Sequence, residues 1–314
     1  MANIAVTGGN GFIGGHIVDE LQNAKHNVFI IDVLQGIKKK NNFFKIDIND
    51  TKNLEKCFIE NKIEYVFHIA AIANARQSIE DPVQTIDINV KGTASVLFAS
   101  HKAQVKKVIL ASTVWVFNAC EKDFTKSKNI TLDETALIKP EGGKHFYTTS
   151  KLVSELLCQD FSSLKNLKFT ILRYGIPYGP NMWKGLVLRS FVENALGKKP
   201  LNIIGDGTAK RRFIHVSDLA KAHLLSLSEK ADNQIFNIEG NNDVTIGELA
   251  NLVAQNIENT SVNFTEDSTR KGELNMDNFE ISNLKAKKLL NWEPKIEIKQ
   301  GVKDYIDWYK SNNS

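Results

Sequence analysis

Tyr147 and Lys151 are the residues of this sequence best suited to move a proton. They stand four positions apart in Tyr147-Thr148-Thr149-Ser150-Lys151, and residues four apart share one face of a helix. A free tyrosine has a pKa of about 10, which a neighbouring ammonium lowers because it favours the phenolate. The pair could therefore act as a base that removes an alcohol proton while a hydride leaves the same carbon.

A glycine-rich turn near the N-terminus could hold the cofactor that hydride transfer requires. The apolar run Asn3–Thr7 breaks into Gly8-Gly9-Asn10-Gly11-Phe12-Ile13-Gly14, and helical spacing resumes over residues 16–21. Glycine tolerates positive φ and lets a ligand approach the backbone closely. The start of the following helix would offer N–H groups and a positive dipole to a diphosphate. The spacing Gly8-x-x-Gly11-x-x-Gly14 differs from the commoner G-x-G-x-x-G.

Asp32 indicates which cofactor the turn would bind. It ends a second apolar run, residues 28–31, and lies 18 positions beyond Gly14. An acid at about this spacing accepts hydrogen bonds from both ribose hydroxyls and repels a 2′-phosphate, which predicts NAD rather than NADP. The run Lys38-Lys39-Lys40 could attract a 2′-phosphate, but we interpret it as a solvated loop. The alternative is an ordinary loop with an acid that only ends a strand, and the two features together favour the cofactor.

Alternating apolar strands and helical segments would position these residues. The expected strands cover residues 3–7, 28–31, 43–48, 65–69, 107–111 and 169–173, and the expected helices cover 16–21, 54–61, 83–101 and 145–162. This alternation predicts an α/β fold with a doubly wound parallel sheet, whose ligands bind at the carboxyl ends of the strands. The residues expected there are Gly8, Asp32, Asp47, Ala70, Ser112, Thr113 and Tyr174.

The second half of the chain has a different organisation. Gly175, Pro177, Gly179 and Pro180 place four breakers in six positions, which indicates that the chain leaves the sheet. We expect an NAD-binding domain over residues 1–173, with added segments near 211–238. Residues 174–314 would form mainly a smaller α/β substrate-binding lobe that interleaves with the sheet. Within it, Thr245 and Glu248 predict a capping box at a helix start.

Composition narrows the class of protein further. The chain has 314 residues, 42% hydrophobic and 24% charged, with a net charge of +4. No basic stripe interleaved with aromatic residues predicts a nucleic-acid surface. Three cysteines without metal-ligand spacing indicate reduced thiols and no metal site. Neither a leader peptide nor a membrane span is expected, which predicts a cytoplasmic protein.

Several further motifs carry a family resemblance. They are Asp47-Ile48, His68-Ile69-Ala70-Ala71, Asn89-Val90-Lys91-Gly92-Thr93, Ala111-Ser112-Thr113, Arg173-Tyr174, Tyr178-Gly179-Pro180 and Arg270-Lys271-Gly272-Glu273. Together with the glycine turn, Asp32 and Tyr147 to Lys151, they resemble the extended short-chain dehydrogenase/reductases. Within these, the chain is similar to the NAD-dependent epimerase/dehydratase group that acts on nucleotide sugars. The resemblance extends from residue 3 to about residue 308 and implies a Rossmann sheet.

The resemblance implies a role for each matching residue. Tyr147 would be the base, Lys151 would bind the nicotinamide ribose, and Thr113 would hydrogen-bond the reacting sugar oxygen, with Ser112 as the alternative if the register slips by one. Arg211 and Arg270 would grip the substrate diphosphate. The implied NAD-binding set is Gly8, Gly11, Phe12, Ile13, Gly14, Asp32, Asp47, Ile48, Ala70, Ala71, Asn89, Tyr147, Lys151 and Tyr174. The helices over residues 83–101 and 145–162 would form a homodimer.

The resemblance leaves the reaction open between several classes. Related 4,6-dehydratases carry an Asp-Glu pair after the catalytic threonine, whereas Thr113 is followed by Val114-Trp115. This disfavours dehydration and favours an epimerase of a UDP- or other nucleotide-activated hexose that passes through a 4-keto sugar. The alternatives are a reductase, dehydrogenase or dehydratase of the same fold, and a non-catalytic NAD-binding regulator. The family pattern also changes at Val116-Phe117-Asn118, Ile176-Pro177 and Arg212, which lie near the expected substrate lobe.

Overall fold

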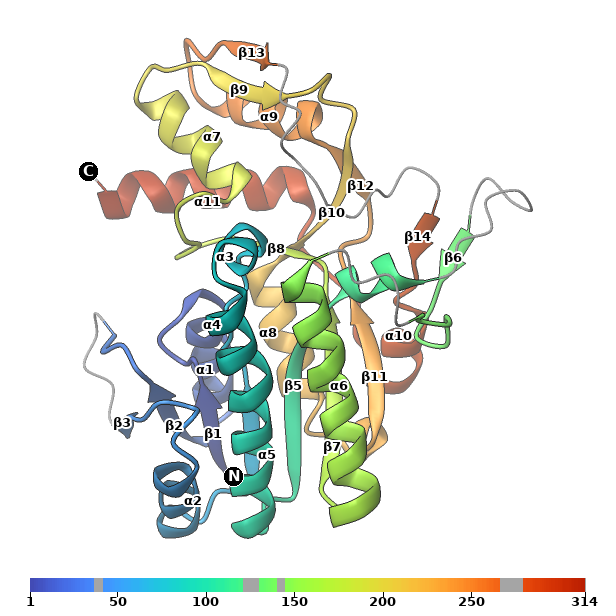
Figure 1. The fold of residues 1–314 in the computed structure, drawn as a ribbon. Helices are drawn as coiled ribbons and strands as arrows, with labels where there is room; N and C mark the ends of the chain where they lie inside the picture. The colour runs from blue at the N-terminus through green and yellow to red at the C-terminus, as the bar shows by residue number, and fades with distance from the viewer. Residues whose placement is uncertain (37–41, 121–129, 140–144, 266–278, 314) are drawn as a thin grey trace.

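A parallel seven-stranded sheet forms the centre of the molecule (Figure 1). The computed structural model describes residues 1–36, 42–120, 130–139, 145–265 and 279–313. The strand order is β11-β7-β5-β4-β1-β2-β3. The strands are β1 (Asn3–Thr7), β2 (Asn27–Asp32), β3 (Phe43–Lys45), β4 (Tyr65–His68), β5 (Lys107–Thr113), β7 (Lys168–Tyr174) and β11 (Gln234–Ile238). The α/β fold with a parallel doubly wound sheet is therefore confirmed.

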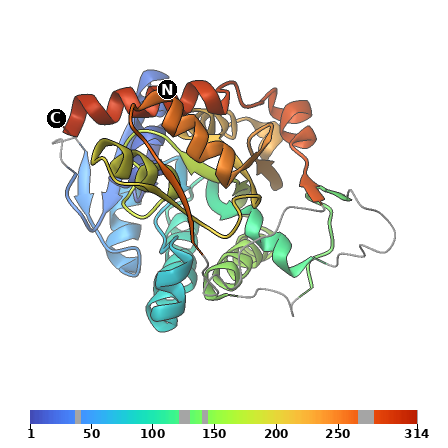
Figure 2. The same cartoon turned by 90° about the horizontal axis from the view of Figure 1, so that it is seen from above.

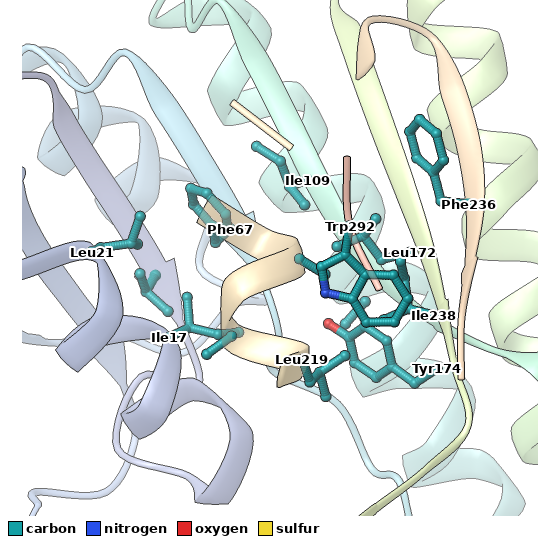
Figure 3. Close-up of a cluster of buried hydrophobic side chains, with 14 of the residues drawn as sticks. Ile17, Leu21, Phe67, Ile109, Leu172, Tyr174, Leu219, Phe236, Ile238 and Trp292 are labelled. Carbon is teal, nitrogen blue, oxygen red and sulfur yellow. The ribbon is translucent and has the colours of Figure 1, made fainter. Parts of the chain in front are cut away.

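Helices cover both faces of this sheet. On one face lie α2 (Thr51–Glu60), α5 (Gly92–Lys102) and α6 (Phe146–Lys165), and Figure 1 shows α5 and α6 side by side in front of the sheet. The other face is covered by α1 (Phe12–Asn23) and α8 (Val216–Leu225). Figure 3 shows the core on that face, where residues of α1 and α8 pack against β4, β5, β7 and β11. Trp292 closes this core, and its indole N–H donates to the Asp218 carbonyl at 2.9 Å.

A smaller lobe with its own core lies beyond the carboxyl ends of the strands (Figures 1 and 2). Its three-stranded sheet pairs β8 (Ile176–Tyr178), β10 (Lys210–His215) and β12 (Asp243–Thr245), and β9 (Leu201–Ile204) pairs β13 (Val262–Thr265). Its helices are α7 (Val187–Leu196), α9 (Ile246–Asn256) and α11 (Ile298–Asn313). The lobe core includes Phe12, the first residue of α1.

The two halves of the sequence interleave. Strand β11 and helix α8 come from the second half but complete the large sheet and its cover. A further parallel pair joins β6 (Ile130–Leu132) to β14 (Phe279–Ile281), just before α10 (Leu284–Leu290). The expected interleaving of lobe and sheet is thus present in the chain trace.

The main differences from the sequence-based expectations concern short or irregular elements. The expected helix over residues 83–101 consists of α4 (Pro82–Ile86), a π-helical turn η1 (Asp87–Lys91) and α5. Strand β8 occupies the expected breaker loop, and it tolerates Pro177 because it lies at the edge of its sheet. The remaining short elements are α3 (Ala75–Glu80), η2 (Val114–Ala119) and η4 (Glu229–Ala231). The Thr245 capping box is confirmed: the Glu248 N–H donates to its hydroxyl at 3.0 Å.

None of the described helices combines the length and the apolar character that a membrane crossing requires.

Candidate active site

The glycine turn between β1 and α1 has a geometry that side chains would prevent. Gly8 has a φ of +69°, and a Cβ on it would lie 2.8 Å from the Ala70 nitrogen. A Cβ on Gly14 would lie 2.0 Å from the Gly8 carbonyl oxygen. The Gly8 N–H donates to the Ile31 carbonyl at 2.8 Å, which fixes the turn against β2. The turn is therefore held tightly folded, with the backbone exposed at the start of α1.

A cavity of about 560 Å³ opens over this turn. It is lined by most of the expected cofactor residues, namely Gly8, Gly11, Phe12, Ile13, Gly14, Asp32, Asp47, Ile48, Ala70 and Ala71. A bare backbone cradle at a helix N-terminus suits a diphosphate, and a carboxylate suits ribose hydroxyls. The residues present therefore fit NAD.

Asp32 is fixed at the end of β2 by main-chain donors. Its two carboxylate oxygens accept the Asn10 N–H at 3.0 Å and the Leu34 N–H at 3.1 Å. These hydrogen bonds hold the carboxylate at the cavity wall. The lysine run at positions 38–40 lies outside the described residues.

Four of the expected cofactor residues, Asn89, Tyr147, Lys151 and Tyr174, do not line the cavity, and two of them, Asn89 and Tyr174, lie behind its walls. The buried Asn89 amide clamps the main chain of Ile72, accepting its N–H at 2.8 Å and donating to its carbonyl at 2.9 Å. Asn89 thus supports the loop that follows β4, which does line the cavity. The Tyr174 hydroxyl contacts His223 Nε2 at 2.5 Å within the core beneath α8. Both side chains support the site from behind.

Thr113 and Tyr147 meet at the carboxyl end of β5. Burial raises the pKa of Tyr147 to about 12, although the neighbouring Thr113 hydroxyl acts in the opposite direction. The Tyr147 N–H also donates to the Ser78 hydroxyl at 3.3 Å. Ser78 lies in α3 beside Gln77, which lines the cofactor cavity. The pair therefore stands next to the cavity, linked to it through α3.

Lys151 lies on α6, the same helix as Tyr147, as the spacing predicts. It is buried one turn beyond Tyr147, and its ammonium donates to the Ala111 carbonyl at 2.9 Å. Burial lowers the pKa of Lys151 to about 8, although the Glu155 carboxylate acts in the opposite direction. The expectation that Lys151 lowers the pKa of Tyr147 is wrong for this structure, because desolvation of the phenol dominates.

The Ser112 hydroxyl contacts a buried ion pair, formed by Glu155 and Arg173, beneath the site. The hydroxyl donates to Glu155 at 2.5 Å, and Arg173 donates to the same carboxylate at 2.7 and 3.0 Å. The side chains of Arg173 and Glu155 are almost fully buried. The Ser112 hydroxyl is therefore engaged in this cluster, whereas Thr113 lies beside Tyr147.

An aromatic wall surrounds Tyr147, and sequence reasoning missed part of it. The His145 ring stacks on Tyr147 with centroids 6.1 Å apart, and Trp115 meets His145 edge-on at 5.1 Å. His145 also caps α6, because its Nδ1 accepts the Thr148 N–H at 3.2 Å. Burial lowers the pKa of His145, so the wall is uncharged at neutral pH. The sequence signal that could have revealed His145 is its position at the start of the expected helix, two residues before Tyr147.

The structure describes only one of the two expected substrate arginines. Arg211 lies half-buried on β10 and donates to the Lys210 carbonyl at 2.7 Å. The neighbouring Arg212 pairs with Asp243 at 2.6 Å and donates to the Ile281 carbonyl at 3.0 Å. Arg212 therefore ties β10 to β12 and β14. Arg270 lies outside the described residues.

Among the described residues, no cluster of three or more His, Cys, Asp or Glu side chains could hold a metal ion. Cys57, Cys120 and Cys158 form no disulfide with any residue that the structure describes.

Comparisons with known proteins agree with this geometry. The pattern of the NAD dependent epimerase/dehydratase family matches residues 4–238. The chain is 33% identical to a putative UDP-glucose 4-epimerase of Methanocaldococcus jannaschii, over 99% of each chain. It is 30% identical to a UDP-N-acetyl-alpha-D-glucosaminuronate decarboxylase of Bacillus cytotoxicus, over 97% of each chain. The structure of UDP-glucose 4-epimerase of Thermus thermophilus in complex with NAD superposes with a TM-score of 0.84 at 28% identity, covering 99% of both chains.

Proposed function

Because this chain belongs to the NAD-dependent epimerase/dehydratase family, we propose that it is a nucleotide-sugar epimerase that inverts one hydroxyl-bearing carbon of a hexose. The observation that carries the proposal is the placement of Tyr147, on α6, beside Thr113 at the carboxyl end of β5 and next to the cofactor cavity. The two residues that follow Thr113 carry no acid.

Two residues of the chain would handle the proton of the reacting hydroxyl. The Thr113 hydroxyl hydrogen-bonds the reacting sugar oxygen, and Tyr147 Oη takes the proton of that hydroxyl and later returns it. NAD supplies a hydride acceptor and, in its oxidised form, a positive charge that favours the phenolate. Lys151, which follows Tyr147 by one turn of α6, would hold the cofactor ribose. The neutral wall of Trp115 and His145 excludes water from one side of the reacting carbon.

The absence of acids after Thr113 supports epimerisation over elimination of water. Val114 is buried, and Trp115 packs edge-on against Tyr147 at 6.3 Å. An elimination needs an acid to protonate the departing hydroxyl and a base to remove the other proton. Neither Val114 nor Trp115 can do this. Oxidation and return of a hydride at one carbon needs only the single base that Tyr147 provides.

We assign the substrate to the UDP-hexoses on the strength of the relatives and the lobe. The relative from Methanocaldococcus jannaschii is named for UDP-glucose. Arg211 lies on β10, opposite in direction to the structural Arg212, because side chains alternate along a strand. Its guanidinium would contact the substrate diphosphate, together with Arg270.

The decisive experiment combines cofactor content with product analysis. The purified protein would be denatured to assay released NAD, and the native protein incubated with UDP-, GDP- and dTDP-hexoses. Isomer formation without net NADH accumulation is expected. Stoichiometric cofactor turnover would instead identify a dehydrogenase or reductase, and loss of water or carbon dioxide from the sugar would identify a dehydratase or decarboxylase. Inactivity towards every sugar nucleotide, despite bound NAD, would refute the substrate assignment.

The proposal includes a homodimer formed through α5 and α6, which lie side by side in Figure 1. Val96 and Leu97 are buried in the monomer, whereas Phe98 and Leu156 are 40% and 58% exposed. The exposed pair offers apolar area to a second copy of the chain. Light scattering should report a dimer, and Leu156→Glu should convert it to a monomer. A monomeric wild-type protein would contradict this part of the proposal.

A further inference from the structure

A loop from the second half of the chain is fastened to the helix that begins at the glycine turn. The loop joins β8 to α7. The Pro180 carbonyl lies 2.9 Å from His16 Nε2 on α1. Three residues later, the Trp183 ring meets the Phe12 ring edge-on, with centroids 5.9 Å apart and planes at 77°. Two contacts thus bring Trp183 to the first turns of α1.

Trp183 forms part of the cofactor cavity. Every other described residue that lines this cavity lies between Gly8 and Ile88. The Trp183 side chain keeps 36% of its surface exposed although Phe12 covers one side of the ring. The indole Nε1–H, which can only donate, makes no hydrogen bond to any residue that the structure describes. A ring face and a donor are therefore available at the cavity wall.

The backbone around Trp183 is firmly held. The preceding Met182 is fully buried, and its carbonyl accepts the Arg189 Nη1–H at 2.6 Å. Arg189 is fixed in turn by an ion pair with Glu193 at 2.7 Å. Gly179 has a φ of +136°, and a Cβ there would lie 2.8 Å from Val216. The loop is therefore a built part of the site, and the position of Trp183 does not depend on a loose surface contact.

We infer that Trp183 covers the diphosphate end of bound NAD and slows its release, so that the second half of the chain contributes directly to cofactor retention. The inference rests on the proposal that NAD occupies this cavity. Trp183 stands beside Phe12, at the end of the cavity where the glycine turn presents its N–H groups. Its indole N–H can donate to a phosphate oxygen there. Retention suits a reaction in which the same cofactor must return the hydride it received.

The test compares NAD release from Trp183→Ala with release from the wild type and from Trp308→Ala. Trp308 is a matched control because it stacks on Tyr305 at 5.7 Å on α11 and does not line the cavity. After gel filtration, Trp183→Ala should retain less NAD, with release about tenfold faster, which corresponds to about 1.4 kcal/mol. Trp308→Ala should release NAD as slowly as the wild type.

A second variant separates cofactor contact from folding. Trp183→Phe keeps a ring against Phe12 but removes the donor, so its NAD release should lie between the wild type and Trp183→Ala, with an unchanged melting temperature for the cofactor-free protein. Equal NAD release by all four proteins would overturn the inference while leaving NAD in the cavity. If the wild type neither carries nor takes up NAD, the placement of the cofactor fails and the inference fails with it.

Discussion

Replacing Glu155 by glutamine should destabilise the folded protein strongly, because it leaves a buried cation without its counter-charge. The Glu155 carboxylate accepts three hydrogen bonds, two from Arg173 and one from Ser112. Arg173 is 3% exposed, and its remaining terminal nitrogen, Nη1, already lacks a partner in the described structure. A glutamine side chain has the same shape, but its NH₂ group would face the guanidinium, donor against donor.

The size of the effect follows from this burial. Removing one partner of a buried ion pair costs about 3–5 kcal/mol, because the other charge stays desolvated. At the unfolding entropy typical of globular proteins, a loss of about 3 kcal/mol in a chain of 314 residues lowers the melting temperature by about 5 °C. The same substitution at Glu80, whose ion pair with Arg76 has exposed side chains, should change stability by less than about 0.5 kcal/mol.

A double-mutant cycle measures the interaction itself. Arg173→Met removes the buried charge. The loss in free energy of unfolding of the double variant, Glu155→Gln with Arg173→Met, should therefore be about 2 kcal/mol smaller than the sum of the losses of the two single variants. Urea unfolding of the cofactor-free proteins, followed by circular dichroism, supplies the four free energies. Additive losses, or a Glu155→Gln variant no less stable than Glu80→Gln, would refute the argument that this pair is desolvated and coupled.

Three further outcomes are expected. Gly14→Ala should abolish NAD retention in equilibrium dialysis, because its Cβ would lie 2.0 Å from the Gly8 oxygen, whereas Gly15→Ala, with 3.9 Å to its nearest neighbour, should retain NAD. Tyr147→Phe should lower the epimerisation rate at least about 100-fold while leaving NAD content unchanged; a smaller loss would exclude this phenol as the base. Burial raises the pKa of Glu239 from its ordinary 4.5 to about 8, so the folded state holds a proton that the unfolded state releases. Wild-type stability should therefore fall as the pH rises from 4.5 to 8, and urea midpoints should fall less steeply for Glu239→Gln; equal slopes would contradict this.

The sheet was predictable because its strands and helices repeat with clear periodicity, and because ligands of such sheets bind at one edge. The π-helical turn at Asp87–Lys91 was not predictable, because apolar spacing does not reveal one extra residue in a turn. Strand β8 was hidden by Pro177, which reads as a breaker unless the edge position of the strand is known.

In the candidate site too, sequence spacing predicts which residues share a helix, but it does not predict how deeply their side chains are buried. Spacing alone placed Tyr147 and Lys151 on one helix, but the protonation preference of Tyr147 depends on how deeply the phenol is buried. The partner of Lys151 is a carbonyl at Ala111, which lies 40 positions away in the sequence. Trp183 reaches Phe12 across a still larger separation. Contacts of this kind arise from tertiary packing, and local sequence patterns do not encode them.

The interleaved chain path limits how this protein can be recombined with its relatives. Strand β11 pairs with β7 along its whole length, from Gln234 opposite Thr170 to Ile238 opposite Tyr174. Helix α8 bonds to α1 through Lys221 and Glu20 at 3.2 Å. A chimera with one crossover near residue 174 would exchange this strand and helix together with the lobe, and would set foreign side chains against the native sheet. Transfer of substrate preference by gene shuffling therefore requires at least three crossovers, two before α8 and β11 and one after them, so that the donor supplies the lobe and the recipient keeps its own strand and helix.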